Sequence, residues 1–522
     1  MLKPLRLFVH ATRWTRRVVP PAICGLCMAS PAQASWSSPR ALGGCPTAPP
    51  QIAFPSASPS TPTGPGAIVW LERSADCRSR AAGRGANAPP TLSIVWLGAG
   101  DRVSFTDSEP LTSALASASA SALIAQGAGQ GRVAVAAASA PRAVVLQGHA
   151  PRGLQLAAAL PTQGSAAVSF AHAYLGDVVL ASVRSGPSIA VDVERYYRPS
   201  FEPPLRIPIG PGPVTALTAA MDYRSDVLVA WQQDGSIYAH MLRASGHAEP
   251  TQRVGPSAPN PELQALVSDD NRGMIAWSAT QAAGGSAART SVYLALSSSG
   301  VRFHGRRAIA TFADPAGAGL QRGSLALVRL ADEGVTLAWT SVEHGHYVVL
   351  AVPAAFATVR PATQLTPPTA QAVLAALAPG AGDEALALWR RAPQGDALPD
   401  WSRAQLWSTR TFIDARGLVG HTSSEQVGPA GSAAAPAVAV DPADDRAVVA
   451  WSAPGAHGPI DYALGPVSPR YRERSFSTPT AAAGGGVHWL RVSIAVIAVA
   501  GIALIGWTLR ARRRLSAGDR SA

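Results

Sequence analysis

A short apolar run that ends in tryptophan recurs along this chain and constrains its fold more than any other feature. Each copy follows a turn rich in Asp, Glu or Gly. The copies are Val227–Trp231, Met274–Trp277, Val335–Trp339, Ala385–Trp389 and Val448–Trp451. Self-similarity at this spacing predicts a repeat architecture, in which one small unit of structure is stacked many times.

The segment 213–256 shows the repeated unit most completely. Apolar alternation, turn residues and the Asp234-Gly235 hairpin signal divide it into four strands. We expect these strands at Thr215–Ala220, Val227–Trp231, Ile237–Leu242 and Glu249–Val254. Four antiparallel strands in about forty residues match the size of one blade of a β-propeller.

The same order of strands and turns recurs on both sides of this unit. Further units are expected at 260–312, 322–366, 371–428 and 434–476, and upstream at 165–210 and 131–163, where the tryptophan is missing. The prediction is an all-β chain that forms a β-propeller of about seven four-stranded blades over 131–476. A ring buries both faces of every sheet and leaves only short edges.

The recurrent tryptophans end the apolar runs that fit the buried second strand of each blade. We therefore expect each indole to wedge between adjacent blades, where its burial contributes about 2–3 kcal/mol. The alternative is an exposed aromatic ring that stacks on a sugar.

The repeat resembles the divergent β-propeller repeats of secreted bacterial proteins over about 131–476. It lacks the paired Gly-His and Trp-Asp of WD repeats, the Ser-x-Asp-x-Gly-x-Thr-Trp box of sialidases and the double glycine of kelch repeats. The resemblance thus implies a propeller fold and transfers no catalytic residue.

Residues 1–34 have the features of a secretory signal peptide. A basic region ends at Arg16-Arg17, an apolar stretch runs from Val18 to Met28, and Ala32-Gln33-Ala34 offers small residues for cleavage. An amphipathic anchor or a misassigned start codon is the alternative. We expect export, and hence a propeller outside the cytoplasm.

The chain ends in a segment that resembles a membrane span. Residues 477–491 form a flexible tether, and Val492–Leu509 contains eighteen residues without a charge. At 1.5 Å per residue such a helix is ~27 Å long, enough to cross a hydrocarbon core. The arginines of 510–522 predict a cytoplasmic tail, since positive charge stays inside. We expect a single-pass protein of the plasma membrane.

The segments before the repeats are less regular. Residues 35–66 are predicted to be a Ser/Pro-rich linker. Residues 67–130 are an irregular N-terminal part that could complete the ring. It holds strand-like runs at 67–71 and 92–97 and an Ala/Ser tract at 112–126, for which helix and loop both remain open.

Two cysteines, Cys45 and Cys77, remain after the signal peptide. An oxidising compartment and an even count favour a disulfide between them, with two free thiols as the alternative. No His or Cys lies near them at the spacing of zinc ligands.

The net charge of +12 does not indicate a nucleic-acid partner. Residues 1–34 and 491–522 each carry a net +5, which leaves +2 for everything between them. Phosphate binding needs a basic patch on the folded domain.

The turns before the tryptophan strands are acidic, and Asp and Asn favour turns by bonding to their own backbone. The functional alternative is calcium, which binds carboxylate-rich loops. The best candidate is the turn with Asp441, Asp444 and Asp445, although its spacing matches no known calcium loop. We expect no resident cofactor or metal, with calcium as the open alternative.

The loops between the second and third strands differ in length, and long insertions on one face of a repeat ring often bind ligands. They are short at 232–236 and 340–346 and long at 278–290 and 390–404. The last contains a mixture suited to a protein or glycan contact: Arg390, Arg391, Asp400, Trp401 and Arg403. A plain solvated insertion is the alternative.

We conclude that the sequence predicts a membrane-anchored extracytoplasmic propeller that binds or scaffolds an extracellular protein or glycan, and that it favours a binding role over an enzymatic one without deciding between them. A cell-surface glycan hydrolase or lyase on the same scaffold is the second hypothesis, and it requires convergent carboxylates. A sensor with a cytoplasmic partner is the third, and the short tail argues against it.

Overall fold

The computed structural model describes residues 35–468, with gaps at 56–64, 73–90, 111–121, 162–167, 173–177, 185–189, 315–323, 394–398, 430–435 and several shorter ones. The chain divides into two units, Met1–Ala34 and Ser35–Ala522, and everything described here belongs to the second. The predicted signal peptide, Cys45, Cys77, the tether, the membrane helix and the tail lie outside the described residues. Within the described ranges, no helix has the length and apolar character needed to cross a bilayer.

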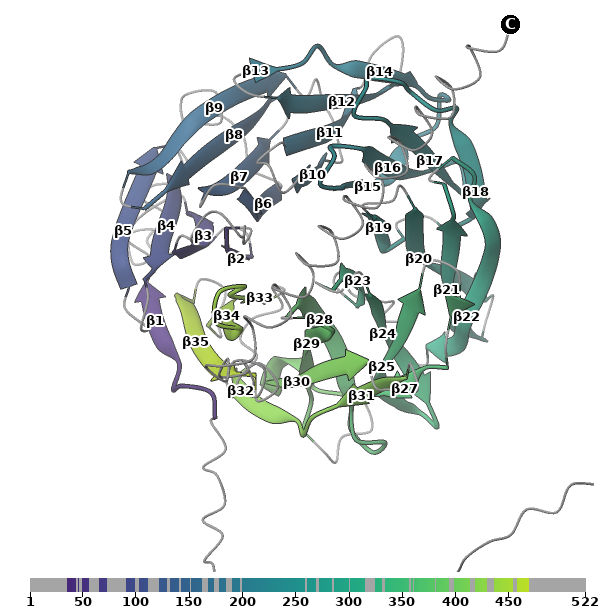
Figure 1. Ribbon diagram of the computed structural model, residues 1–522. Helices are drawn as coiled ribbons and strands as arrows, with labels where there is room; N and C mark the ends of the chain where they lie inside the picture. Colours follow the sequence, from purple (N-terminus) through teal and green to yellow (C-terminus); the bar gives the residue numbers. More distant parts are fainter. Residues whose placement is uncertain are drawn as a thin grey trace, which may run out of the picture. The chain divides into compact units, whose positions relative to one another are not determined.

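Eight antiparallel sheets form a β-propeller, and we number them as blades 1–8 in chain order (Figure 1). Blade 1 contains β2 (Gln51–Ala53), β3 (Gly66–Glu72), β4 (Thr91–Leu97) and β5 (Val103–Pro110). Blade 2 contains β6 (Ala122–Ala128), β7 (Arg132–Ser139), β8 (Arg142–His149) and β9 (Gly153–Pro161). Blade 3 contains β10 (Val168–His172), β11 (Val178–Arg184), β12 (Ala190–Tyr197), β13 (Ser200–Phe201) and β14 (Leu205–Pro208).

Blades 4 to 6 continue the same order. Blade 4 contains β15 (Val214–Met221), β16 (Val227–Gln233), β17 (Ser236–Leu242) and β18 (Gln252–Pro256). Blade 5 contains β19 (Leu263–Val267), β20 (Gly273–Ala283), β21 (Ser286–Ser297) and β22 (His304–Asp314). Blade 6 contains β23 (Leu325–Arg329), β24 (Val335–Glu343), β25 (His346–Ala355), β26 (Thr358–Val359) and β27 (Thr363–Gln364).

The last two blades complete the ring. Blade 7 contains β28 (Ala372–Pro379), β29 (Glu384–Arg391), the short helix η1 (Trp401–Arg403), β30 (Gln405–Ile413), β31 (Val419–His421) and β32 (Glu425–Pro429). Blade 8 contains β33 (Ala437–Val440), β34 (Arg446–Ser452) and β35 (Ile460–Val467). The first strands of consecutive blades contact one another from β2 round to β33, and β33 contacts β2 again (Figure 1).

The prediction of seven blades was wrong by one, because the sequence signal of blade 1 is interrupted. Residues 73–90 separate β3 from β4, and β5 is mostly polar, so the strand-like runs at 67–71 and 92–97 did not suggest a complete unit. The end of the Ala/Ser tract, for which helix and loop were open, belongs to strand β6 of blade 2.

The segment expected to be a linker supplies the strand that closes the ring. β1 (Arg40–Gly43) pairs with β35 as the fourth strand of blade 8, with Ala41 opposite Asp461. Just before it, the Ser37 N–H donates to the Leu464 carbonyl at 2.8 Å. The buried Trp36 donates from Nε1 to Ser408 Oγ of blade 7 at 2.9 Å. The first and last parts of the propeller are therefore hydrogen-bonded into one sheet.

The recurrent tryptophans lie where the sequence predicted, between blades. Each packs in an apolar cluster against the preceding blade: Trp231 against blade 3, Trp277 against blade 4, Trp339 against blade 5, Trp389 against blade 6 and Trp451 against blade 7. Trp70 of β3 is a sixth member and packs against blade 8. All six are 3% exposed or less, so stacking on a sugar is ruled out for these indoles.

Candidate functional site

The loops between second and third strands share one end of the propeller with the links between blades. Gln233, beside the Asp234-Gly235 turn, donates from Nε2 to the carbonyls of Gly210 and Gly212 in the link from blade 3 to blade 4. Both turn residues have positive φ, which fits the predicted tight hairpin. We call this end the loop face.

The loop face differs from the prediction at blade 5. A long loop was expected at 278–290, but β20 and β21 continue there as a hairpin that pairs as far as Ala283 and Ser286. The Thr280 and Thr290 hydroxyls bond to each other at 3.0 Å across this ladder. Small and hydroxylated residues resembled a loop in sequence, yet they satisfy their backbone groups as strands. The real irregular loop lies on blade 7, between β29 and β30.

Gln371, in the link between blades 6 and 7, fixes the start of that loop. Its Oε1 accepts a hydrogen bond from the Tyr347 N–H at 3.0 Å, and its Nε2 lies 3.2 Å from His346 Nδ1. Its carbonyl accepts the Ala392 N–H at 2.9 Å. One side chain and its backbone thus hold the hairpin of blade 6 against the first residue of the blade 7 loop. His346 takes part in this junction through its ring nitrogen.

Two aromatic contacts lie beside the Gln371 junction. The Trp401 indole meets the Tyr347 ring edge to face, with centroids 5.9 Å apart and planes at 79°. The Arg391 guanidinium lies 5.2 Å from the centre of the Trp407 ring. Trp401, Arg391 and Trp407 are all partly exposed. We refer to Tyr347, Arg391, Trp401 and Trp407 as the aromatic patch.

The five residues expected to form a binding surface do not all face the same way. Arg391 and Trp401 belong to the aromatic patch, and the Asp400 carbonyl accepts the Arg403 N–H at 3.3 Å in the short helix η1. Arg403 is exposed. Arg390 is 5% exposed, and burial lowers its pKa. Its ladder partner Leu406 belongs to the cluster between blades 7 and 8, so Arg390 points away from the patch.

Tyr347, Gln371 and Trp407 complete the arrangement and were missed in the sequence. Trp407 sits in the third strand of blade 7, opposite Trp389, and no other third strand has a tryptophan at that position. This second tryptophan in one blade departs from the repeat and could have marked Trp407 as a candidate binding residue in the sequence. Nothing local marks Gln371, because its three contacts reach two different blades.

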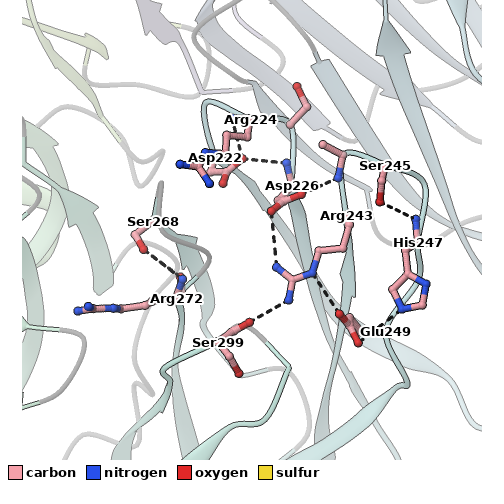
Figure 2. A network of polar contacts seen from close by, with 12 residues as sticks. Asp222, Arg224, Asp226, Arg243, Ser245, His247, Glu249, Ser268, Arg272 and Ser299 are labelled. Atoms are coloured by element: carbon pink, nitrogen blue, oxygen red, sulfur yellow. Dashed lines mark hydrogen bonds and ion pairs between the residues drawn. The ribbon is translucent and has the colours of Figure 1, made fainter. Parts of the chain in front are cut away.

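The opposite end of the blades carries the acidic turns, and their carboxylates serve the turns themselves. Asp222 Oδ1 accepts the N–H groups of Arg224 and Asp226, at 2.9 and 2.8 Å (Figure 2). Asp226 pairs with Arg243 at 3.5 Å. These contacts are those of turn-forming aspartates. Among the described residues, no group of three or more His, Cys, Asp or Glu side chains is placed to hold a metal ion.

Arginines at the ends of third strands bond from one blade to the next on this side. Arg195 of blade 3 donates to the carbonyls of Ser225 and Arg243 in blade 4, at 3.4 and 3.2 Å. Arg243 in turn donates to the Ser299 carbonyl of blade 5 at 2.9 Å, and it also pairs with Glu249 (Figure 2). These inter-blade arginines satisfy backbone carbonyls that apolar packing could not.

The calcium candidate lies in the equivalent turn of blade 8. Asp445 is fully buried and pairs with Arg410 of blade 7 at 2.9 Å. Asp444 pairs with Arg446 at 3.4 Å and accepts its N–H. Asp441 accepts the Ala443 N–H at 2.8 Å, and burial raises its pKa to about 6. The three carboxylates have separate protein partners and do not converge on one point.

Comparisons with known proteins show neither a family nor an activity for this chain. No protein-family model matches this chain, and no curated protein does. Similar solved structures include a eukaryotic initiation factor, at 10% identity over 69% of this chain and 75% of that one, with a TM-score of 0.36. A protein from Lactobacillus plantarum matches at 13% identity over 61% of this chain and 94% of that one, with a TM-score of 0.32. A structure from a study of two prolyl endopeptidases matches at 12% identity over 78% of this chain and 54% of that one, with a TM-score of 0.37. These likenesses are too distant to argue from, and the assignment as a propeller rests on the sheets themselves.

Proposed function

We propose that this protein is an exported, membrane-anchored propeller that binds an extracellular protein or glycan through the aromatic patch. The observation that supports it most is the state of Arg391. Its guanidinium stacks on Trp407, is partly exposed and forms no ion pair within the described part of the chain. A stacked guanidinium keeps its N–H edge available for an anionic or carbonyl group of a ligand.

The surroundings of Arg391 favour binding over a passive loop. Arg, Trp and Tyr are the residue types that dominate binding energy at interfaces. The Gln371 junction holds Tyr347 and the start of the loop in place before any ligand arrives. A preformed patch loses less conformational entropy on binding.

The alternative of a glycan hydrolase or lyase needs paired carboxylates with shifted pKa values on one rim. Among the described residues, the pKa is raised to about 6 for Glu194 and Asp441, and burial also raises the pKa of Glu425 and Asp461. Glu194 is buried in β12 of blade 3, and Asp441 lies in an acidic turn of blade 8. They belong to different blades, and Asp192, the carboxylate beside Glu194, is buried with it and paired with Arg184 and Arg206, so none of these groups supports this alternative.

Pull-down and glycan-array binding with the purified full-length protein test the proposal. Arg391→Gln and Trp401→Ala should each weaken capture at least tenfold, while the fold stays intact by circular dichroism. Arg224→Gln is the matched control, since Arg224 is an exposed arginine on the acidic-turn face that contacts Tyr223. Ligand capture that the patch variants leave unchanged would argue against this site.

Membrane anchoring is a separate part of the proposal and rests on the uncharged segment 492–509 and the arginines after it. Alkaline extraction of membranes should leave the full chain in the pellet, and deletion of 492–509 should release it. Protease added outside intact cells should cleave the propeller. Protection of the propeller would contradict the proposed orientation.

A further inference from the structure

The eight boundaries between blades are not alike. Seven apolar clusters each join two neighbouring blades, including blades 8 and 1. Within the described side chains, the boundary between blades 2 and 3 has no such cluster. Blade 3 also lacks the wedge tryptophan that blades 1 and 4 to 8 have, and so does blade 2. We call this boundary the polar seam.

The side of blade 3 that faces blade 2 follows from strand alternation. Val179, Ala181 and Val183 of β11 pack toward blade 4, so Leu180, Ser182 and Arg184 face blade 2. Their ladder partners include Asp192 and Glu194 of β12. Residues paired directly across antiparallel strands share a face, so both carboxylates point into the polar seam.

Both carboxylates of the seam are buried. Asp192 is 2% exposed and pairs with Arg184 at 2.6 Å and with Arg206 at 3.4 Å. Glu194 is 7% exposed. Burial, and then the charge of Asp192, raise the pKa of Glu194 to about 6, against the opposing effect of Arg184. Glu194 is therefore charged at neutral pH in a place that disfavours its charge.

Most of the blade 2 side chains that face the seam cannot neutralise the charge of Asp192 and Glu194. Val133, Val135 and Ala137 of β7 pack toward blade 1, so Arg132, Ala134 and Ala136 face the seam. In β8, Val145, Gln147 and His149 lie on the same side. The buried Gln147 Nε2 has no hydrogen-bond partner among the residues that the structure describes. Among the described residues, the titratable and charged groups around Glu194 are Asp192, Arg184 and Arg206 on blade 3, and Arg132 and His149 on blade 2.

We propose that the ring opens reversibly at the polar seam and that protonation of Glu194 holds the seam closed. The other boundaries are joined by apolar clusters, most with a wedged indole, which do not respond to pH. Glu194 forms no ion pair with any described residue, and a buried carboxylate in that position destabilises the closed state when it is charged. Opening the seam exposes Glu194 to water, so the population of the open state rises as the carboxylate ionises.

Low pH should therefore favour the closed ring, and high pH the open one. The pKa of Glu194 is raised from the ordinary 4.5 in the closed ring to about 6. Its contribution to closure is complete below pH 4.5 and is lost as the pH rises through 6. If the open state has the ordinary pKa, the population of the open form should grow on the order of tenfold between pH 5 and pH 7.5.

Site-specific thiol labelling tests this in the full-length chain. Ala136→Cys places a probe on the seam in the second strand of blade 2, and Ala230→Cys places the matched control in the second strand of blade 4. Both alanines are buried, at 3% and 0% exposure. A small thiol reagent is followed at each cysteine by mass spectrometry. The ratio of the two rates cancels the effect of pH on thiol reactivity.

At pH 7.5 the seam cysteine should react faster than the control, and the ratio should fall on the order of tenfold at pH 5. Glu194→Gln mimics the protonated acid and should make the ratio low at both pH values. Glu343→Gln, at a hairpin tip on the loop face, should behave like the parent chain. Equal rates at the two cysteines, or a pH dependence that survives Glu194→Gln, would overturn the proposal.

Discussion

Arg410 of blade 7 donates to both the carboxylate and the main-chain carbonyl of Asp445 in blade 8, at 2.9 and 2.8 Å. The same guanidinium also bonds to the Pro466 carbonyl at 3.0 Å. Arg410 and Asp445 lie 35 residues apart in the chain and are both buried. The boundary between the last two blades is thus held by a charged contact as well as by the Trp451 cluster.

Arg410→Ala should destabilise the propeller by about 3–5 kcal/mol, because it leaves the carboxylate of Asp445 buried without its cation. Chemical denaturation followed by tryptophan fluorescence measures the change. Arg224→Ala, on the surface of another turn, should leave the transition midpoint unchanged. A midpoint for Arg410→Ala equal to that of the parent would show that Asp445 has other sufficient partners.

Trp277→Ala should cost about 3–5 kcal/mol of stability, because the indole fills the space between blades 4 and 5. Trp277 Nε1 also donates to the Pro256 carbonyl at 3.1 Å. Trp401→Ala, at the aromatic patch, should cost clearly less, since Trp401 is partly exposed. Thermal unfolding of the two variants gives the comparison. A larger loss of stability for Trp401→Ala than for Trp277→Ala would mean that the aromatic patch contributes more packing energy than the indole between the blades.

Trp36→Ala should loosen the closure of the ring, although Trp36 lies outside every repeat. The substitution removes the bond to Ser408 and the packing against blades 7 and 8. We expect a loss of about 3 kcal/mol and faster amide exchange in β35 than in β16. Uniform exchange across these two strands would contradict closure by the N-terminal segment.

Asp441 should make stability depend on pH. Burial raises its pKa from 3.8 to about 6. Its stabilising contribution is therefore present below pH 3.8 and lost as the pH rises through 6. Asp441→Asn keeps an oxygen for the Ala443 N–H and should flatten this part of the stability profile. Denaturation midpoints of both chains between pH 3.5 and 7 test it, and parallel profiles would count against the assignment.

Calcium should not raise the melting temperature, because Asp441, Asp444 and Asp445 bond to separate protein groups. Thermal melts in calcium and in chelator provide the measurement. A calcium-dependent rise that Asp444→Asn abolishes would restore this turn as a metal site.

The sequence predicted the repeat because burial between blades demands the same residue type at the same strand position. Trp231, Trp277, Trp339, Trp389 and Trp451 could be recognised for this reason. Trp70 has the same role, yet the spacing to its neighbouring strands hid it. The closing strand β1 has only four residues, Arg40–Gly43, within a Ser/Pro-rich stretch, so its partner β35 alone reveals it.

The candidate site was predicted only in part. Arg391 and Trp401 were singled out as members of a long loop, and that loop lies on the loop face. Arg390 is next to Arg391 in sequence, but strand alternation turns its side chain toward blade 8. Tyr347 and Gln371 join the site through long-range hydrogen bonds and ring contacts, which no local pattern announces.

An experimental structure of the full-length chain tests the central claim most directly. We expect eight antiparallel blades of four or five strands, with β1 antiparallel to β35 and each of the six wedged indoles packed against the preceding blade. A ring of seven blades, or tryptophans scattered over unrelated environments, would contradict it.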